Sequence, residues 1–359
     1  MKRQVPEDAR RDLVVLAPGL LGPVPLPADQ VPTAPALSRL LSLGRCDGGV
    51  ANAGTACGLT QALLQHFGAE ASAPYARAAD DPDWDRAGFV LHADPVHLRA
   101  DRDQLRLFDA SQFRLTREEG DALVAALNRD FADDGLRLSA PSPSRWYLEP
   151  PTAPALEAPP LDAVSGRSLD SASPGGADAR HWAGLLSEIQ MALFQSPVNA
   201  ERERRGEPAI NALWLSGGGT WRPLGASGFR RLVSARPLAR GLADAAGVAV
   251  DAAVIGSTAD PGRPVAGTLV VADDLQQAAQ TAKPLRWADA ITALDNHLAP
   301  ALAELRRGAL AAVEIDLLDG RRWRLERQDL RRFWRRRRRF AQLLDAPSSR
   351  APNTAGGSL

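Results

Sequence analysis

The chain has 359 residues, 45% of them hydrophobic, which is enough to bury the core of one large domain or two smaller ones. Its 43 Lys and Arg residues balance 43 Asp and Glu residues, so no overall field favours nucleic acid or a membrane surface. Two cysteines exclude a disulfide framework and a thiolate zinc site, and no apolar run reaches the ~20 residues that span a bilayer. We therefore expect a cytoplasmic protein with no membrane partner.

The N-terminal part predicts the start of an α/β domain. Residues 12–17 form a short apolar strand, which a Pro-Gly pair ends. Residues 36–43 carry apolar side chains at helical spacing and stop at Gly44, a residue suited to a helix C-terminus. A second helix is expected from Gly58 to His66.

The middle of the chain predicts an inserted β-α-β domain. Residues 89–92, 105–108 and 145–148 have strand patterns. Thr116 and Glu119 form a capping box that begins a helix extending to Asn128. A stretch rich in Pro, Ala and Ser then indicates a linker.

The C-terminal half returns to alternating strands and helices. The predicted strands are residues 210–215, 248–255, 267–272, 311–318 and 322–325, and the predicted helices are residues 181–194, 287–307 and 328–344. This order predicts an α/β fold with a mainly parallel sheet sandwiched by helices and a final antiparallel hairpin.

These elements predict five segments. They are the first part of the α/β domain (1–86), the inserted domain (87–150), the linker (151–180), the second part of the α/β domain (181–345) and a disordered tail (346–359).

The block from Ser196 to Gly219 contains Ser-Pro-Val-Asn, then Arg202, then an Asn-x-x-Trp strand that leads into Gly-Gly-Gly. It resembles the archaeal-type cofactor-independent phosphoglycerate mutases, and in particular a divergent proteobacterial branch labelled phosphoglycerate mutase or regulatory protein. Residues 34–44, 94–99 and 237–247 are similar to other segments of that family. The resemblance implies an alkaline-phosphatase-like fold, and a site where two divalent cations flank a serine nucleophile.

The metal ligands that this resemblance implies are missing at the similar positions. Ala17 stands where the first aspartate is expected, and the segments that begin at Asp273 and Asp316 contain no histidine. Thr55 is a weak candidate for the nucleophile position, and Cys57 is interpreted as core. We therefore predict no cofactor, with Mn or Mg only if the protein is an active enzyme.

One group of histidines and aspartates remains, namely His92, Asp94, His97, Asp101 and Asp103. A metal site is one interpretation of the group, and a solvated strand edge is the favoured one.

The resembling block supplies candidate ligand-binding residues, namely Asn199, Arg202, Asn211, Gly217 and Gly219. The glycine turn has two interpretations: backbone amides that cradle a phosphate, or a tight strand exit, which is favoured. We expect the polar side chains to tie the turn to the strand by hydrogen bonds.

The arginine-rich run from Arg331 to Arg339 is interleaved with aromatic residues. On a helix, Leu330, Phe333, Trp334, Phe340 and Leu344 share one stripe, so a terminal docked helix is favoured and a nucleic-acid partner is not expected.

Three functions follow from these observations. The favoured one is a phosphoglycerate mutase-like protein that has lost its two-metal site and acts as a non-catalytic binding or regulatory protein. Its partner would be a small phosphorylated ligand or another protein. The first alternative is an active phosphoglycerate mutase-type isomerase or phosphotransferase with a rearranged site. The second is an arginine-rich helix that binds nucleic acid or an acidic partner.

Overall fold

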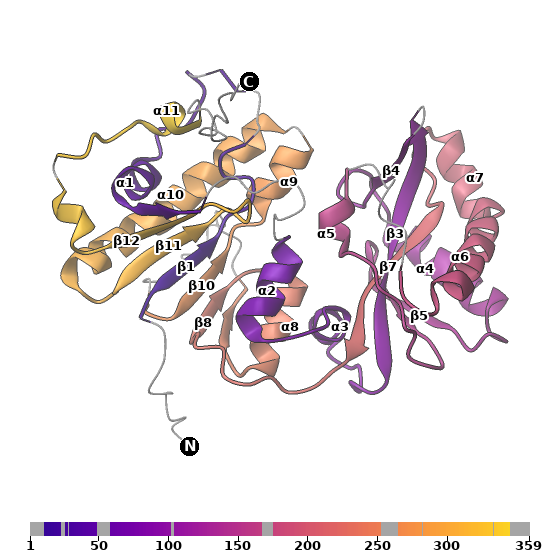
Figure 1. The fold of residues 1–359 in the computed structure, drawn as a ribbon. Coiled ribbons are helices and arrows are strands. Elements are labelled where there is room, and N and C mark those ends of the chain that lie inside the picture. The colour runs from indigo at the N-terminus through magenta and orange to yellow at the C-terminus, as the bar shows by residue number, and fades with distance from the viewer. Residues whose placement is uncertain are drawn as a thin grey trace, which may run out of the picture. The chain divides into compact units, whose positions relative to one another are not determined.

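The computed structural model of the chain describes residues 11–22, 26–27, 29–48, 58–101, 104–166, 175–252, 265–281, 283–332 and 334–344. They form two units, one built on a seven-stranded sheet and the other on a five-stranded sheet (Figure 1). The predicted α/β class, with a mainly parallel sheet and flanking helices, is confirmed. Among the described residues, no helix combines the length and the apolar character needed to cross a bilayer.

The first unit contains the mainly parallel sheet. Its strands lie in the order β2 (Arg45–Asp47), β12 (Arg322–Glu326), β11 (Ala312–Asp316), β1 (Leu13–Leu16), β10 (Thr268–Val271), β8 (Arg231–Val233) and β9 (Ala249–Asp251). The five strands from β11 to β9 are parallel, and β12 and β2 add an antiparallel edge. The predicted final hairpin is therefore present.

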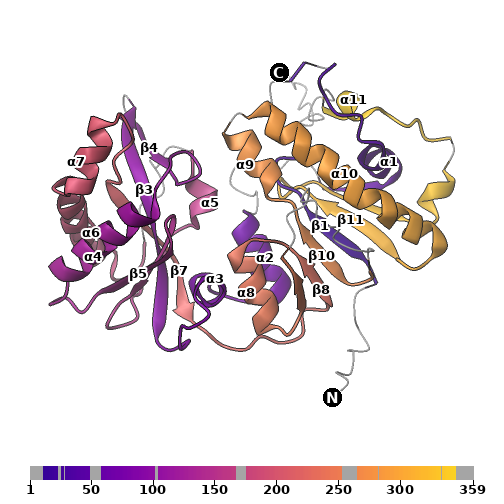
Figure 2. The ribbon, with the colours of Figure 1, turned by 180° about the vertical axis from the view of Figure 1, so that it is seen from behind.

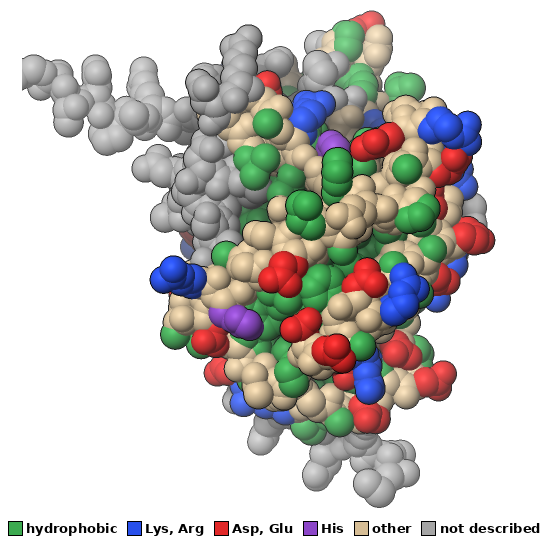
Figure 3. Space-filling model, turned by 90° about the vertical axis from the view of Figure 1, so that its right-hand side faces the viewer, with side chains coloured by type: hydrophobic (Ala, Val, Ile, Leu, Met, Phe, Trp, Pro, Cys, Tyr) green, Lys and Arg blue, Asp and Glu red, His purple; other side chains and the backbone are tan. Residues whose placement is uncertain are grey.

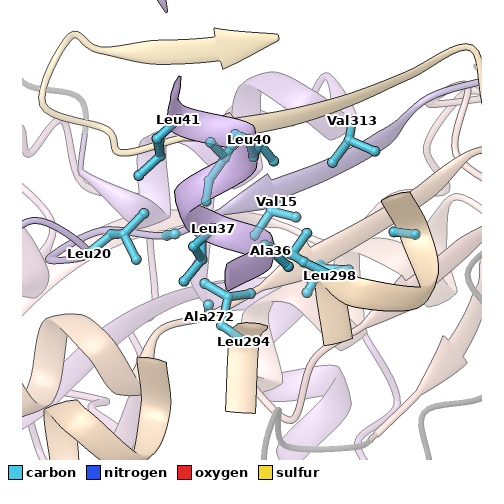
Figure 4. Close-up of a cluster of buried hydrophobic side chains, with 14 of the residues drawn as sticks. Val15, Leu20, Ala36, Leu37, Leu40, Leu41, Ala272, Leu294, Leu298 and Val313 are labelled. Atoms are coloured by element: carbon cyan, nitrogen blue, oxygen red, sulfur yellow. The ribbon is translucent and has the colours of Figure 1, made fainter. Parts of the chain in front are cut away.

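Helices cover this sheet and bury its central strand completely. All four residues of β1 are buried, as expected for a parallel strand covered on both faces. Figure 4 shows Leu37 and Leu40 of α1 (Pro35–Leu43) in one cluster with Leu298 of α10 (Pro284–Arg307). α9 (Asp274–Gln280) packs beside α10.

The N-terminus of α1 is satisfied from another helix. Ala34 at its N-cap offers no side-chain acceptor, but the amide of Leu37 donates to Oδ1 of Asp295 in α10 at 2.8 Å. A carboxylate at this position satisfies an orphan amide and faces the positive end of the helix dipole. Asp295 therefore fixes the two helices to each other.

The second unit is an antiparallel sheet with helices. Its strands are β3 (Phe89–Asp101), β4 (Gln104–Phe108), β5 (Arg137–Ser142), β6 (Arg145–Glu149) and β7 (Ala212–Thr220). Its helices are α2 (Leu59–Phe67), α3 (Ala73–Asp80), α4 (Arg117–Asp130), α5 (Leu161–Val164), α6 (Ala179–Phe194), α7 (Pro197–Arg204) and α8 (Pro237–Ala245). The predicted capping box of Thr116 and Glu119 is present at the start of α4.

The structure draws the boundaries of the inserted part elsewhere than at residues 87 and 150. The second unit comprises residues 60–227 and 236–248, because β7 pairs antiparallel with β3 and α6 packs on the same sheet. The first residues of β7 are buried on both faces, so their continuous apolar pattern is the one expected of a strand in a parallel sheet. The sequence analysis placed this segment in the other domain because it follows the predicted linker.

The predicted helix over residues 328–344 is a second difference. The chain forms only a 3₁₀ turn at Asp329–Arg331 and the short helix α11 (Phe340–Leu344), and the described residues between them are not helical. On a helix, successive arginines would repel one another at i,i+3 and i,i+4 spacing. Phe333, residues 253–255 of a predicted strand and the predicted tail lie outside the described residues.

A close helix crossing provides a test of the second unit. α3 and α8 lie side by side in Figures 1 and 2, and a Cβ at Gly241 would overlap the carbonyl oxygen of Tyr75. Gly241→Ala should therefore lower the free energy of unfolding by about 2 kcal/mol, because the backbones must separate.

Gly184 of α6 is the matched control, since a Cβ there meets no atom within 4 Å. Gly184→Ala should raise the free energy of unfolding by about 0.5–1 kcal/mol through helix propensity alone. Urea denaturation of both variants measures the difference, and equal effects would contradict the close crossing.

Candidate functional site

The carboxyl ends of the parallel strands are the first place to look for a site, because ligands of open α/β sheets bind there. Ala17 follows β1, is fully buried and supplies no ligand atom. Asp316 ends β11, and its Oδ2 accepts hydrogen bonds from Nε and Nη2 of Arg322 at 2.9 and 2.6 Å. Its Oδ1 accepts from the amide of Leu318 at 2.9 Å. Both oxygens of this carboxylate are therefore engaged.

Of the two positions just described, Ala17 offers no ligand atom, and Asp316 already uses both of its carboxylate oxygens. A two-metal site needs several carboxylates and histidines that converge on each ion. In the part of the chain that the structure describes, no three His, Cys, Asp or Glu side chains converge in this way. Thr55 and Cys57 lie outside the described residues.

Two of the predicted ligand-binding residues tie segments of the second unit together. Asn199 is buried, donates from Nδ2 to the carbonyls of Leu193 and Ile210 at 2.7 Å each, and accepts from the amide of Ile210 at 2.8 Å. Asn211 exchanges two hydrogen bonds with the backbone of Leu98 at 2.7 and 2.8 Å. These are the expected bonds between the turn and the strand.

Arg202 is fully buried and joins α7 to α4. Its Nη1 donates to Oε2 of Glu119 at 2.8 Å, and its Nε donates to the carbonyl of Pro208 at 2.9 Å. Burial acts to raise the pKa of Glu119, but hydrogen bonds from Thr116 and Arg205 and the charge of Arg202 outweigh it and lower the pKa. The Thr116 amide, Arg205 and Arg202 together favour the ionised form of the capping-box carboxylate.

The glycine turn is tightly packed. Gly217 has φ +60°, and its carbonyl accepts the amide of Ser72 at 3.1 Å. A Cβ here would overlap Oγ of Ser72 and lie 3.2 Å from Cδ2 of His92, and a Cβ at Gly219 would overlap Ala71. These contacts match the interpretation of a tight strand exit, and they bring the turn against His92.

The structure brings only part of the predicted His/Asp group together. His92 and Asp94 lie on one face of β3, with Nδ1 and Oδ2 4.0 Å apart. His97 points to the other face and contacts the carbonyl of Ala209 at 2.8 Å, whereas Asp101 faces Arg106 at 3.3 Å. Asp103 lies outside the described residues.

Three residues that the sequence did not single out complete a buried polar cluster around His92 and Asp94. Asp80, at the end of α3, accepts from the hydroxyl of Tyr147 at 2.8 Å and from Nε and Nη2 of Arg145 at 2.7 and 2.9 Å. The ring of Tyr147 lies 5.4 Å from that of His92. The negative end of the helix dipole disfavours a carboxylate at a helix C-terminus, so Asp80 requires a nearby cation. An aspartate at the end of a predicted helix was therefore the sequence signal that could have indicated this cluster.

Burial shifts the pKa values of His92 and Asp94 in opposite directions. It raises the pKa of Asp94 to about 7, against the lowering effects of the Trp146 amide and Arg145. It lowers the pKa of His92 to about 4, against the raising effect of Asp80 and with further lowering by Arg236 and Arg145. Between these values both side chains are neutral, so their contact is not an ion pair.

Two atoms of this pair have no hydrogen-bond partner among the described residues, namely Nδ1 of His92 and Oδ1 of Asp94. Buried groups of this kind each cost about 1–3 kcal/mol unless water or a ligand satisfies them. A carboxyl with a pKa near neutrality can take up and release a proton in this range. At 7% exposure Asp94 is reached by a proton or a water molecule and not by a large substrate.

Comparison with known proteins assigns no family to the chain. No family model matches, and neither does any curated protein. The PH0037 protein from Pyrococcus horikoshii is 16% identical with a TM-score of 0.47, covering 88% of this chain and 87% of that one. A cofactor-independent phosphoglycerate mutase from Thermoplasma acidophilum is 15% identical with a TM-score of 0.40, covering 88% and 90%.

Replacement of Arg202 tests whether this residue is structural. Arg202→Met should lower the free energy of unfolding by about 3 kcal/mol, because it removes the buried cation from the partly buried Glu119 carboxylate and leaves only the exposed Arg205 beside it. Arg204→Met is the control: this side chain is 74% exposed, so its loss should change stability by less than about 0.5 kcal/mol. Urea denaturation measures both, and an Arg202 variant as stable as the wild type would contradict the structural role.

The Asp94 carboxyl predicts a pH dependence. Its folded pKa of about 7 lies above its ordinary value of 3.8, so its stabilising contribution is present below about pH 4 and is lost as the pH rises towards 7. His92, with a folded pKa of about 4 and an ordinary value of 6.5, contributes the opposite trend between pH 4 and 6.5. Asp94→Asn removes only the first trend.

The Asp94→Asn variant should therefore gain about 2 kcal/mol in unfolding free energy relative to the wild type between pH 5 and pH 8. Asp101→Asn, at a half-exposed position, is the control and should follow the wild type. Urea denaturation at several pH values measures this, and parallel profiles for wild type and Asp94→Asn would exclude the raised pKa.

Proposed function

We propose that this chain is a phosphoglycerate mutase-like protein that has lost the two-metal chemistry and acts as a non-catalytic binding or regulatory protein. The family resemblance of the block from Ser196 to Gly219 supports the first part. The side chains at the carboxyl ends of the parallel strands support the second.

The observation that carries the proposal is the state of Asp316. Arg322 forms charge-assisted hydrogen bonds with one oxygen of its carboxylate, and the Leu318 amide binds the other. Leu318 has φ +59°, a left-handed conformation that costs a non-glycine residue roughly 1–2 kcal/mol. A carboxylate that holds a strained turn and a guanidinium is committed to internal contacts, so a metal ion would have to displace both.

The ligand of such a protein would be a small phosphorylated molecule or another protein. Asn199, Arg202 and Asn211 already bond to the chain itself, which favours a scaffolding role for this block over direct ligand contact. Gly217 and Gly219 could contact a ligand only through their backbone atoms.

Metal analysis and a mutase assay test this proposal. Purified full-length protein should contain well under one metal ion per chain and should not interconvert phosphoglycerates when manganese is added, because the ligand set is incomplete. Elemental analysis and a coupled assay measure these two properties.

Stoichiometric metal together with turnover would overturn the proposal and support the active-enzyme alternative. In that case Thr55→Ala should abolish turnover, whereas Thr55→Ser, which keeps the hydroxyl, should retain it. A rise in melting temperature with phosphoglycerate, without turnover, would support the binding role.

A further inference from the structure

We propose that the arginine segment, residues Trp334–Arg339, binds single-stranded nucleic acid, with phosphates on its arginines and a base on Trp334. This surface lies within the first unit and uses none of the strand-end residues considered above. The proposal therefore holds whether or not the protein is catalytic.

The arginine segment is held between two buried anchors. Before it, the fully buried Asp329 forms an ion pair with Arg332, with Oδ1 and Nη2 3.0 Å apart. After it, Phe340 is 1% exposed, and its ring stacks on Trp287 with the centroids 6.2 Å apart. Between these anchors the yellow trace in Figure 1 passes beside α1 without forming a helix.

Hydrogen bonds from one side chain and one backbone amide fix the arginine segment to the C-terminus of α1. Arg335 donates from Nη1 to the carbonyls of Leu43 and Gly44 at 3.1 and 3.0 Å, where the helix dipole favours a cation. The amide of Arg338 donates to Oγ of Ser42 at 3.1 Å. A segment ordered in this way loses little conformational entropy when a ligand binds.

The remaining arginines of the segment are exposed, and none of them pairs with a described acidic residue. They are Arg336, Arg337, Arg338 and Arg339. Other arginines of the first unit are paired with acidic residues: Arg324, for example, contacts Asp12, Glu314 and Glu326. On the face of the second unit seen in Figure 3, acidic and basic side chains are interspersed.

Other cations extend the positive surface beside the arginine segment. Burial lowers the pKa of Arg39, on α1, and the charges of Arg337 and of Arg306, on α10, lower it further. Arginines from three separate parts of the first unit are thus close enough to repel one another. A polyanion would relieve that repulsion and release counterions, which is the main source of affinity for nucleic acids.

Trp334 favours a nucleic acid over an acidic protein segment. Its side chain is 69% exposed at the start of the arginine run. Aromatic rings beside a basic track stack on bases in single-strand binding proteins, whereas an acidic peptide offers no base. Residues of a non-helical chain advance at most about 3.5 Å each, so arginines two apart are separated by up to about 7 Å. This is the order of the distance between successive phosphates of an extended single strand.

The test measures binding of full-length protein to a fluorescent oligouridine of about 20 nucleotides by anisotropy, at about 50–200 mM salt. The variant with Arg336, Arg337, Arg338 and Arg339 changed to Gln should bind at least about tenfold more weakly. Its salt slope should be lower by about 0.7 for each phosphate that the variant no longer neutralises. Arg335 stays unchanged because it caps α1. Trp334→Ala should weaken binding about fivefold or more without altering the slope, because stacking involves no counterion.

The control removes the same number of positive charges from exposed positions of the second unit. It carries Gln at Arg129, Arg137, Arg180 and Arg204. Thermal unfolding confirms that each variant folds. Equal losses in the two charge variants would show a non-specific effect of net charge and overturn the proposal. Competition by polyglutamate as strong as that by oligouridine, with no effect of Trp334→Ala, would indicate an acidic protein partner and overturn it as well.

Discussion

The antiparallel pairing of β3 with β7 is the contact on which the second unit depends. It joins residues 89–96 to residues 212–220, which are more than a hundred positions apart in the chain. Asn211 extends this pairing by bonding the backbone of Leu98, and Asn199 secures the turn that leads into β7. The pairing also sets Gly217 against Ser72, so that α3 can cover the face of the sheet that holds His92. The block that carries the family resemblance is thus the block that closes this unit.

Much of the fold could be predicted from the sequence, because local patterns specify local elements. The capping box at Thr116, the helical spacing of residues 36–43 and the strand that ends at Ala17 all depend on near neighbours. The membership of β7 in the second sheet depends instead on a distant part of the chain. An apolar run predicts a buried strand but does not indicate which strand it pairs with. The arginine run was misassigned for a related reason: its apolar stripe has helical spacing, but the mutual repulsion of its charges favours a non-helical path.

The buried polar cluster could be predicted only in part. Side chains alternate between the two faces of a strand, so the spacing alone places His92 and Asp94 on one face and His97 on the other. The partners that matter, Asp80 and Tyr147, come from a helix and another strand, so only the tertiary structure unites them. Burial then makes both His92 and Asp94 neutral near pH 6, which lowers the cost of keeping two ionisable groups inside the sheet. A neutral pair with unsatisfied atoms is a place where a proton or a water molecule can reside without the entry of a larger ligand.

The first unit uses its charged side chains in two different ways. At the carboxyl ends of the parallel strands, Asp316 is bound by Arg322 and by a backbone amide. On the outer surface of the same unit, arginines that could have paired with acidic side chains are exposed beside an aromatic ring. Unpaired like charges destabilise the compact state, and a bound ligand of opposite charge removes this repulsion. Among the described residues of the first unit, Asp316 thus helps to hold the fold, whereas Arg336, Arg337, Arg338 and Arg339 present their charges outward, where a polyanion can bind them.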